Sequence, residues 1–144
     1  MWEVSTGRCY KQWDLKAPVS CVAWNPNAAL GIIAVSVGND VVILELALGN
    51  RDMETTPLAE VLAKAREIKN KAAAKADPKK KLVDWVDASE SESQTGIVLR
   101  IRHGKPLTQI SWHYKGDYIV TVAPTANTKA ILIHQFSKIA IATT

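Results

Sequence analysis

The sequence contains few of the residues that form disulfide or metal sites. Only 2 of its 144 residues are cysteine, and Cys9 and Cys21 stand apart, with neither a Cys-x-x-Cys pair nor a histidine cluster of ligand spacing. We therefore interpret both as reduced, buried thiols of an intracellular protein that holds no metal. No secretory signal is recognisable. The uncharged stretch 17–39 is broken by prolines and asparagines, which argues against a membrane-spanning helix.

Catalytic patterns are also missing. The three histidines, His103, His113 and His134, stand singly, and no pair of carboxylates is spaced for acid–base catalysis. Glycine-rich nucleotide-binding motifs and the His-Glu-x-x-His zinc motif are absent. Ser111 and His113 alternate on one expected strand, but no aspartate is placed to complete a triad. We therefore expect a protein that is not an enzyme and that has neither a cofactor nor a small-molecule substrate.

What is present is the composition of one globular domain. Apolar residues make up 47% of the chain and charged residues 22%. The 18 Lys and Arg residues against 14 Asp and Glu residues give a net charge of +4. That excess is too small to identify a nucleic-acid partner, so the position of the charges matters more than their sum.

Short runs rich in β-branched residues recur between polar turns, which is the pattern of β-strands. The expected strands are 19–24, 31–36 and 41–46, followed later by 107–112, 118–122 and 130–136. The two sets begin 88 residues apart, and each first strand ends in a tryptophan, Trp24 or Trp112. We interpret the two sets as an internal repeat, because similar strands at a fixed spacing are the signature of repeat folds.

The repeat resembles that of WD-repeat β-propellers. In those proteins a Trp-Asp pair closes the third strand, a Thr-Gly turn follows, and a Gly-His pair precedes the next first strand. The pairs that stand at these places are Trp2-Glu3, Thr6-Gly7 and Arg102-His103. A WD repeat takes about 40–45 residues, so the longer spacing predicts an insertion between Gly49 and Gly96.

This resemblance implies an all-β fold, a partial WD-repeat β-propeller of about two blades of antiparallel strands with one helical, Lys-rich insertion. The expected parts are 1–49, the end of one blade and the inner strands of the next; 50–96, the helical and charged insertion; 97–138, the following blade; and 139–144, a tail. Because propellers typically have about 4–8 blades, we expect the chain to be a piece of a longer protein.

Well-formed WD blades carry a hydrogen-bonded chain of His, Ser or Thr, Asp and Trp. Here His103 and Thr121 match the first two members, but Ile133 stands at the place of the Trp and Asn127-Thr128 at that of the Asp. The residues that we assign to structural WD positions are Trp2, Glu3, His103 and Thr121. Since the polar chain is incomplete, we expect blades held mainly by apolar packing.

The insertion begins with a helix signal. Thr56 offers a hydroxyl cap and Pro57 suits the first helical position. An apolar stripe at helical spacing follows, made of Leu58, Val61, Leu62, Ala65 and Ile68. We expect this stripe to dock on the rest of the protein.

Charge is concentrated in the same insertion. Residues 51–81 carry nine basic and five acidic side chains, and residues 84–92 add four acids and no base. The residues for which we expect contact with RNA phosphates or a partner are Lys64, Arg66, Lys69, Lys71, Lys75, Lys79, Lys80, Lys81 and Trp85. The alternatives for the charges are a solvated segment whose two halves neutralise each other, a nuclear import signal at Lys79–Lys81, and phosphorylation of Ser89, Ser91 or Ser93. For Trp85 the alternative is an anchor that packs on the propeller.

A closer resemblance comes from the second half. The residues that carry it are Trp85 to Glu90, Gly96, Leu99, Ile101 to Pro106, Trp112-His113, Gly116 to Tyr118 and Ile133 to Gln135, with Trp2 to Thr6, Ser20 to Pro26 and Ala47 to Gly49 from the first half. Together they resemble the C-terminal propeller of the block-of-proliferation (BOP) family of nucleolar ribosome-biogenesis proteins.

The BOP resemblance implies a scaffold. It would act in a complex with a pescadillo-type protein and a second WD-repeat protein on large-subunit precursors, in the nucleolus and nucleoplasm of the nucleus. It would be needed for maturation of the large-subunit and 5.8S rRNAs, with large-subunit pre-rRNA as a partner and no membrane contact. The competing hypothesis is a generic WD-repeat adaptor between proteins, unrelated to ribosomes.

Overall fold

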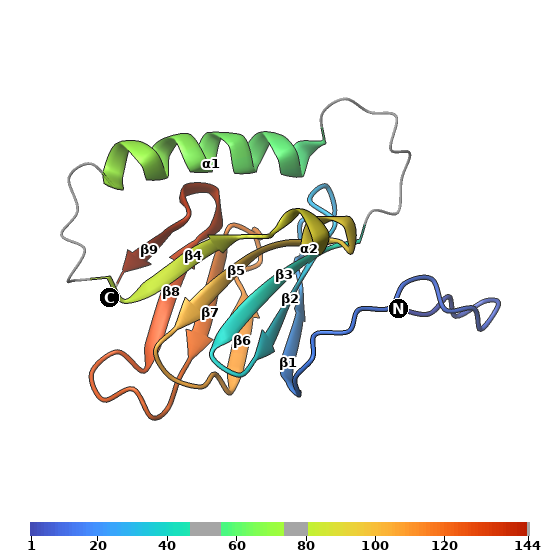
Figure 1. The fold of residues 1–144 in the computed structure, drawn as a ribbon, viewed down its shortest axis with the longest axis horizontal. Helices are drawn as coiled ribbons and strands as arrows, with labels where there is room; N and C mark the ends of the chain where they lie inside the picture. Colours follow the sequence, from blue (N-terminus) through green and yellow to red (C-terminus); the bar gives the residue numbers. More distant parts are fainter. Residues whose placement is uncertain (47–55, 74–80, 144) are drawn as a thin grey trace.

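The computed structural model of the protein describes residues 1–46, 56–73 and 81–143. It is mostly β, with two antiparallel sheets and few helices (Figure 1), which confirms the all-β expectation. In chain order the elements are β1 (Val19–Trp24), β2 (Ile32–Val37), β3 (Asp40–Glu45), α1 (Pro57–Ala73), β4 (Val83–Asp87), α2 (Glu90–Gln94), β5 (Ile97–His103), β6 (Gln109–Trp112), β7 (Tyr118–Val122), β8 (Ile131–Gln135), η2 (Phe136–Lys138) and β9 (Ala140–Thr143). None of the described helices has the length and apolar character needed to cross a membrane.

The first sheet has the strand order β1-β2-β3-β5-β4, and every neighbouring pair is antiparallel. Strands β2 and β3 consist largely of Val and Ile, whose branched side chains fit a pleated surface. All six residues of β2 are buried, so both faces of this part of the sheet are covered. One face packs toward the second sheet, and the other contacts Met1, Trp13 and Leu15 of the N-terminal segment.

The second sheet is a simple meander, β6-β7-β8-β9. Its strands alternate between buried and more exposed positions, as in β7, where Ile119 and Thr121 point inward. The expected tail is not free of structure, since Ala140–Thr143 forms the fourth strand of this sheet.

The two sheets meet along their first strands. Strand β1 lies beside β6, and side chains of β1 reach backbone carbonyls on the β6 side: Ser20 Oγ donates to Leu107 O (3.1 Å) and Asn25 Nδ2 to Gly116 O (2.8 Å). In return, Trp112 Nε1 donates to Ala23 O at 3.1 Å. These bonds fix the position of one sheet against the other, because each satisfies a polar group that the contact removes from water.

The boundary between the sheets differs from the expected one. We placed residue 97 at the start of the following blade, but β5 pairs with β3 and therefore belongs to the first sheet. Strand β4, inside the expected insertion, pairs with β5 on its other side. Leu99 and Ile101 explain this placement, since both are fully buried in the core between the sheets. The second sheet thus starts after His103.

Helix α1 covers one side of both sheets (Figure 1). It starts as expected, with Pro57 in the first position and Thr56 Oγ1 accepting from Ala59 N at 3.1 Å. Its stripe docks through Leu58, Leu62 and Ala65, which are buried in the same core as residues of both sheets.

Replacing Leu62 by Ala tests whether this docking stabilises the fold. Leu62 is 5% exposed, and removing a buried leucine side chain typically costs about 2–5 kcal/mol of unfolding free energy. Ile68, on the same helix but 44% exposed, is the matched control, and Ile68→Ala should change stability by less than about 1 kcal/mol. Urea unfolding of the two variants is the measurement. Equal losses would contradict the docking.

Candidate functional site

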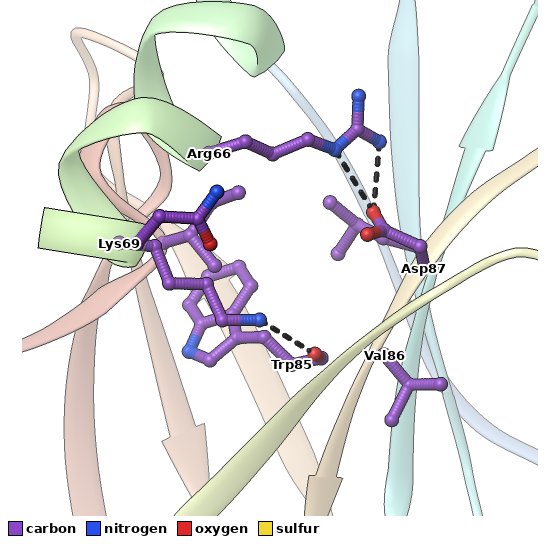
Figure 2. Close-up of a pocket in the computed structure, with 8 residues that line it drawn as sticks. Arg66, Lys69, Trp85, Val86 and Asp87 are labelled. Atoms are coloured by element: carbon purple, nitrogen blue, oxygen red, sulfur yellow. Dashed lines mark hydrogen bonds and ion pairs between the residues drawn. The ribbon is translucent and has the colours of Figure 1, made fainter. Parts of the chain in front are cut away.

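Three of the residues expected to contact RNA or a partner, Arg66, Lys69 and Trp85, lie where α1 faces strand β4 (Figure 2). Arg66 donates through both Nε (3.1 Å) and Nη2 (2.8 Å) to Asp87 Oδ1 at the end of β4. One helical turn further on, Lys69 Nζ donates to the backbone carbonyl of Trp85 at 3.0 Å. Both side chains therefore join the helix to the strand. The sequence alone did not distinguish this structural role from a contact with RNA.

The other basic side chains divide into three groups. Lys71 pairs with Glu67 (2.6 Å) one turn earlier on the helix, and Lys81 pairs with Asp84. The hydrogen bond from Lys81 lowers the pKa of Asp84 below its ordinary value. Lys64 is exposed and forms no ion pair with any residue in the described part of the chain. Lys75, Lys79 and Lys80 lie outside the described residues.

These contacts favour mutual neutralisation as the explanation for much of the charge pattern. Asp84 and Asp87, both from the acidic half, hold Lys81 and Arg66 from the basic half. The pairs are largely exposed, and pairs of that kind contribute about 0–1 kcal/mol each. Their main effect is to neutralise Arg66 and Lys81, two of the residues that we expected to contact RNA phosphates.

Trp85 is an internal anchor. Its side chain is 7% exposed, and its ring meets that of His134 edge-on with centroids 5.9 Å apart. A side chain that contacts a partner must be exposed, and Trp85 is not. Its position agrees with the alternative hypothesis, in which Trp85 is an anchor that packs on the rest of the protein. Strand β4 carries Trp85 into the core because Val83 and Trp85 alternate with the exposed Asp84 and the partly buried Val86.

A small cavity lies beside this helix–strand contact. It measures about 110 Å³ and is lined by Arg66, Lys69, Asn70, Trp85, Val86, Asp87, Leu99 and Ile139. Binding pockets for cofactors or nucleotides are usually about 300–1,000 Å³, so this one is too small for such a ligand. Among the residues that the structure describes, no group of three or more His, Cys, Asp or Glu side chains is arranged to hold a metal ion.

A buried polar cluster connects the two sheets on the core side of Trp85. His103 Nε2 lies 3.0 Å from Thr121 Oγ1, which lies 2.9 Å from His134 Nε2, and the two Nε2 atoms are 3.3 Å apart. His103 Nδ1 faces the carbonyl of Ile101 at 3.1 Å and must donate to it, so His103 Nε2 is an acceptor. Thr121 then donates to His103 and accepts from the Nε2–H of His134. One proton arrangement thus connects three side chains from both sheets, while the buried Nδ1 of His134 has no hydrogen-bond partner among the described residues.

Burial keeps both rings of this cluster neutral. Desolvation lowers the pKa of His103, and desolvation together with the nearby His103 lowers the pKa of His134 to about 3. His103 and Thr121, which we matched to the first two WD positions, are in contact, and a third member that the sequence analysis did not name joins them. His134, next to the Ile133 that we placed at the Trp position, turns inward and becomes the third member. Strand alternation between buried and exposed residues is the signal that would have found it.

The sequence matches curated proteins over nearly its whole length. It is 39% identical over 139 residues to the ribosome biogenesis protein BOP1 homologue of Chlamydomonas reinhardtii, 38% over 140 residues to BOP1 of Homo sapiens, and 36% over 140 residues to BOP1 of Rattus norvegicus. Each alignment covers 96% of this chain. The chain belongs to the BOP1 family. It spans only 16–18% of the length of these relatives, and no protein-family model matches it.

In this BOP1-family chain the other two residues that we assigned to WD positions, Trp2 and Glu3, lie in a separate N-terminal turn. Glu3 Oε2 accepts from Thr6 Oγ1 (2.5 Å), Gly7 N donates to Glu3 O (2.8 Å), and Trp2 bridges to Cys9. Gly7 takes a φ of +68°, a conformation that glycine adopts without strain. Trp2 itself is 68% exposed, so the expected structural role of its ring is not visible within the described residues. The expectation that both cysteines are buried is wrong: Cys9 is exposed in this N-terminal turn, and Cys21 is partly exposed on the edge strand β1.

The buried histidines predict a pH dependence of stability. Between pH 6.5 and about 3 the unfolded chain binds protons at His134 that the folded chain excludes, so the stability present above pH 6.5 is lost as the pH falls through this window. The loss is at most about 1.4 kcal/mol per pH unit for each histidine. Urea unfolding at several pH values above about pH 5, where carboxylates contribute little, measures it.

His134→Phe supplies the control for that experiment. The variant keeps a ring in the core and removes one titrating group, so its stability should fall less steeply with decreasing pH than that of the original chain. An unchanged slope would show that His134 does not resist protonation.

Proposed function

We propose that this chain acts in ribosome biogenesis, as a non-catalytic part of a scaffold. The observation that carries this proposal is the identity of 36–39% to BOP1 proteins over 96% of the chain. The alignments span nearly the whole chain, so they do not rest on a short motif. The names of these relatives describe ribosome biogenesis proteins, and homologous segments of this identity usually keep a shared architecture.

Within that role we propose that the two sheets are neighbouring blades of a WD-repeat β-propeller. Each contains four strands that follow one another in antiparallel order, β1-β2-β3-β5 and β6-β7-β8-β9, and the first strands of the two sheets lie side by side. Propeller blades are four-stranded sheets arranged around a central channel. Strand β4 is an addition to the first blade on its outer side.

We further propose partners and a location. The partners are a pescadillo-type protein, a second WD-repeat protein and large-subunit pre-rRNA, the process is maturation of the large-subunit and 5.8S rRNAs, and the place is the nucleolus and nucleoplasm. The support for this proposal is that the relatives are named ribosome biogenesis proteins. A direct test of the partners is therefore the first experiment.

Affinity recovery of the tagged chain from cell extract tests the role. We expect large-subunit rRNA precursors and a pescadillo-type protein to be enriched over a tag-only control. If the protein partner persists after RNase treatment, the chain contacts protein directly, and if it disappears, RNA holds the complex. Enrichment of unrelated protein complexes without ribosomal precursors would contradict the proposal and favour the generic adaptor.

The Lys-rich insertion supplies a second test. Replacing Lys79, Lys80 and Lys81 together by Ala removes three charges and should weaken association with pre-rRNA, with a smaller salt dependence, because each phosphate contact releases counterions. The melting temperature should stay within a few degrees, since Lys81 forms only an exposed pair with Asp84. Unchanged RNA association in this variant would remove the Lys79–Lys81 run from the RNA contact.

A further inference from the structure

The net positive charge lies in the C-terminal part of the chain and not in the Lys-rich insertion. Residues 1–92 contain 12 basic and 13 acidic side chains, whereas residues 93–144 contain six basic side chains and a single acidic one, Asp117. The C-terminal part, which includes the whole second sheet, therefore carries a charge of +5 that exceeds the +4 of the entire chain. A net positive charge of this kind attracts a polyanion.

Most of this C-terminal charge is not neutralised locally. Arg100 pairs with Glu92 and Arg102 with Asp40. Lys105, Lys115, Lys129 and Lys138 form no ion pair within the described ranges. The one acid, Asp117, accepts hydrogen bonds from Gln135 Nε2 (3.0 Å), Ser137 N (2.8 Å) and Ser137 Oγ (2.9 Å). Its charge is thus directed at neutral donors of the fold and not at a lysine.

The turn between β6 and β7, residues 113–117, presents one of these lysines together with aromatic rings. The rings of His113 and Tyr114 lie with centroids 4.3 Å apart, and the ring of Tyr118 meets His113 edge-on at 6.1 Å. Lys115 Nζ lies 5.8 Å from the centre of the Tyr114 ring, within range of a cation–π interaction. Tyr114 is 74% exposed although it is a large ring. The turn therefore offers a flat aromatic surface with a cation beside it.

This turn is held rigidly. His113 N donates to Tyr118 O (2.8 Å), Gly116 N to His113 O (2.8 Å), and Lys115 N to His113 Nδ1 (3.4 Å). On its other side the turn is fixed to the first sheet, because Asn25 Nδ2 donates to Gly116 O at 2.8 Å. Gly116 has a φ of +77°, and a Cβ there would lie 2.4 Å from Asn25 Oδ1. Such a fixed turn presents its rings without a large ordering cost on binding.

We propose that the β6–β7 turn is a contact site for single-stranded RNA, in which an unpaired base stacks on Tyr114 and a backbone phosphate contacts Lys115. Aromatic rings beside cations are the usual means of binding single strands, since every base has a face that stacks. The identity of the RNA, pre-rRNA, rests on the proposed function. The stacking contact itself can be tested with any single-stranded RNA.

The surroundings favour RNA over a protein partner. The segment 93–144 has one acid, already engaged, and four lysines without an acidic partner among the described residues. An anionic polymer complements this excess of positive charge, of which Lys115 in the turn is part.

Fluorescence anisotropy of the 144-residue chain with a labelled single-stranded RNA of mixed sequence and about 12 nucleotides tests the site. Stacking of one base on an aromatic ring typically accounts for about 5-fold to 150-fold in affinity when the ring is replaced by alanine. Tyr114→Ala should therefore weaken binding at least about fivefold, whereas Tyr114→Phe should stay within about twofold because it keeps the ring. Tyr10→Ala removes another exposed tyrosine, far from the turn in sequence, and should leave binding unchanged.

Lys115→Ala tests the phosphate contact separately. It should reduce the dependence of log Kd on log salt concentration by about 0.7, the value for one phosphate on a single strand. Circular dichroism and urea unfolding establish that the variants are folded, as the exposure of Tyr114 predicts.

The outcomes separate the site from the wider function. RNA binding by the original chain that Tyr114→Ala and Lys115→Ala both leave unchanged would overturn the site while leaving the ribosomal role untouched. Loss of a protein partner from cell extract in Tyr114→Ala, with RNA binding intact, would identify the turn as a protein contact and also overturn it. Selective loss of RNA binding in these two variants supports the site, even if the extract experiment fails to recover ribosomal precursors.

Discussion

The contact between strands β1 and β6 determines where every other element lies. Both strands end their sheets, and an edge strand leaves polar groups that need partners. Here the partners come from the other sheet: Ser20 and Asn25 donate to carbonyls on the β6 side, and Trp112 donates back to Ala23. With these edges together, the inner faces of the sheets enclose one core, and α1 has a continuous apolar surface to cover. The His103–Thr121–His134 cluster is placed inside this core and adds a second polar connection between the sheets.

Much of the architecture follows from local sequence, and the rest depends on contacts between distant residues. The strands, the α1 start at Pro57 and the buried stripe of Leu58, Leu62 and Ala65 agree with periodicity and capping. The pairing of β5 with β3 does not follow from local sequence. The two strands are separated by the insertion, and they come together through the burial of their side chains in the core. The same reason applies to Arg66, whose partner Asp87 lies 21 residues away. His134 was missed because the comparison with WD repeats directed attention to Ile133, one position earlier on the strand.

The distribution of charge changes the functional picture of the insertion. A sequence window shows many lysines near residue 70, but folding brings the acidic half back along β4, where it pairs with Arg66 and Lys81. The second sheet has almost no acids to do the same. The described part of the insertion therefore mainly braces the outer side of the first sheet, while the second sheet carries a net positive charge. Ion pairs that form on folding determine how much of the formal charge of a sequence stays unpaired and can attract a charged partner.

The contact between α1 and β4 also affects how the protein avoids self-association. Strand β4 is the outer edge of the first sheet, and an uncovered edge invites a strand from another molecule to extend the sheet into an aggregate. Lys69 occupies the carbonyl of Trp85, and Arg66 is fixed beside the end of the strand by Asp87. A charged helix thus lies where an incoming strand would have to pair. Helix α1 therefore makes this edge a poor template for amyloid-like growth.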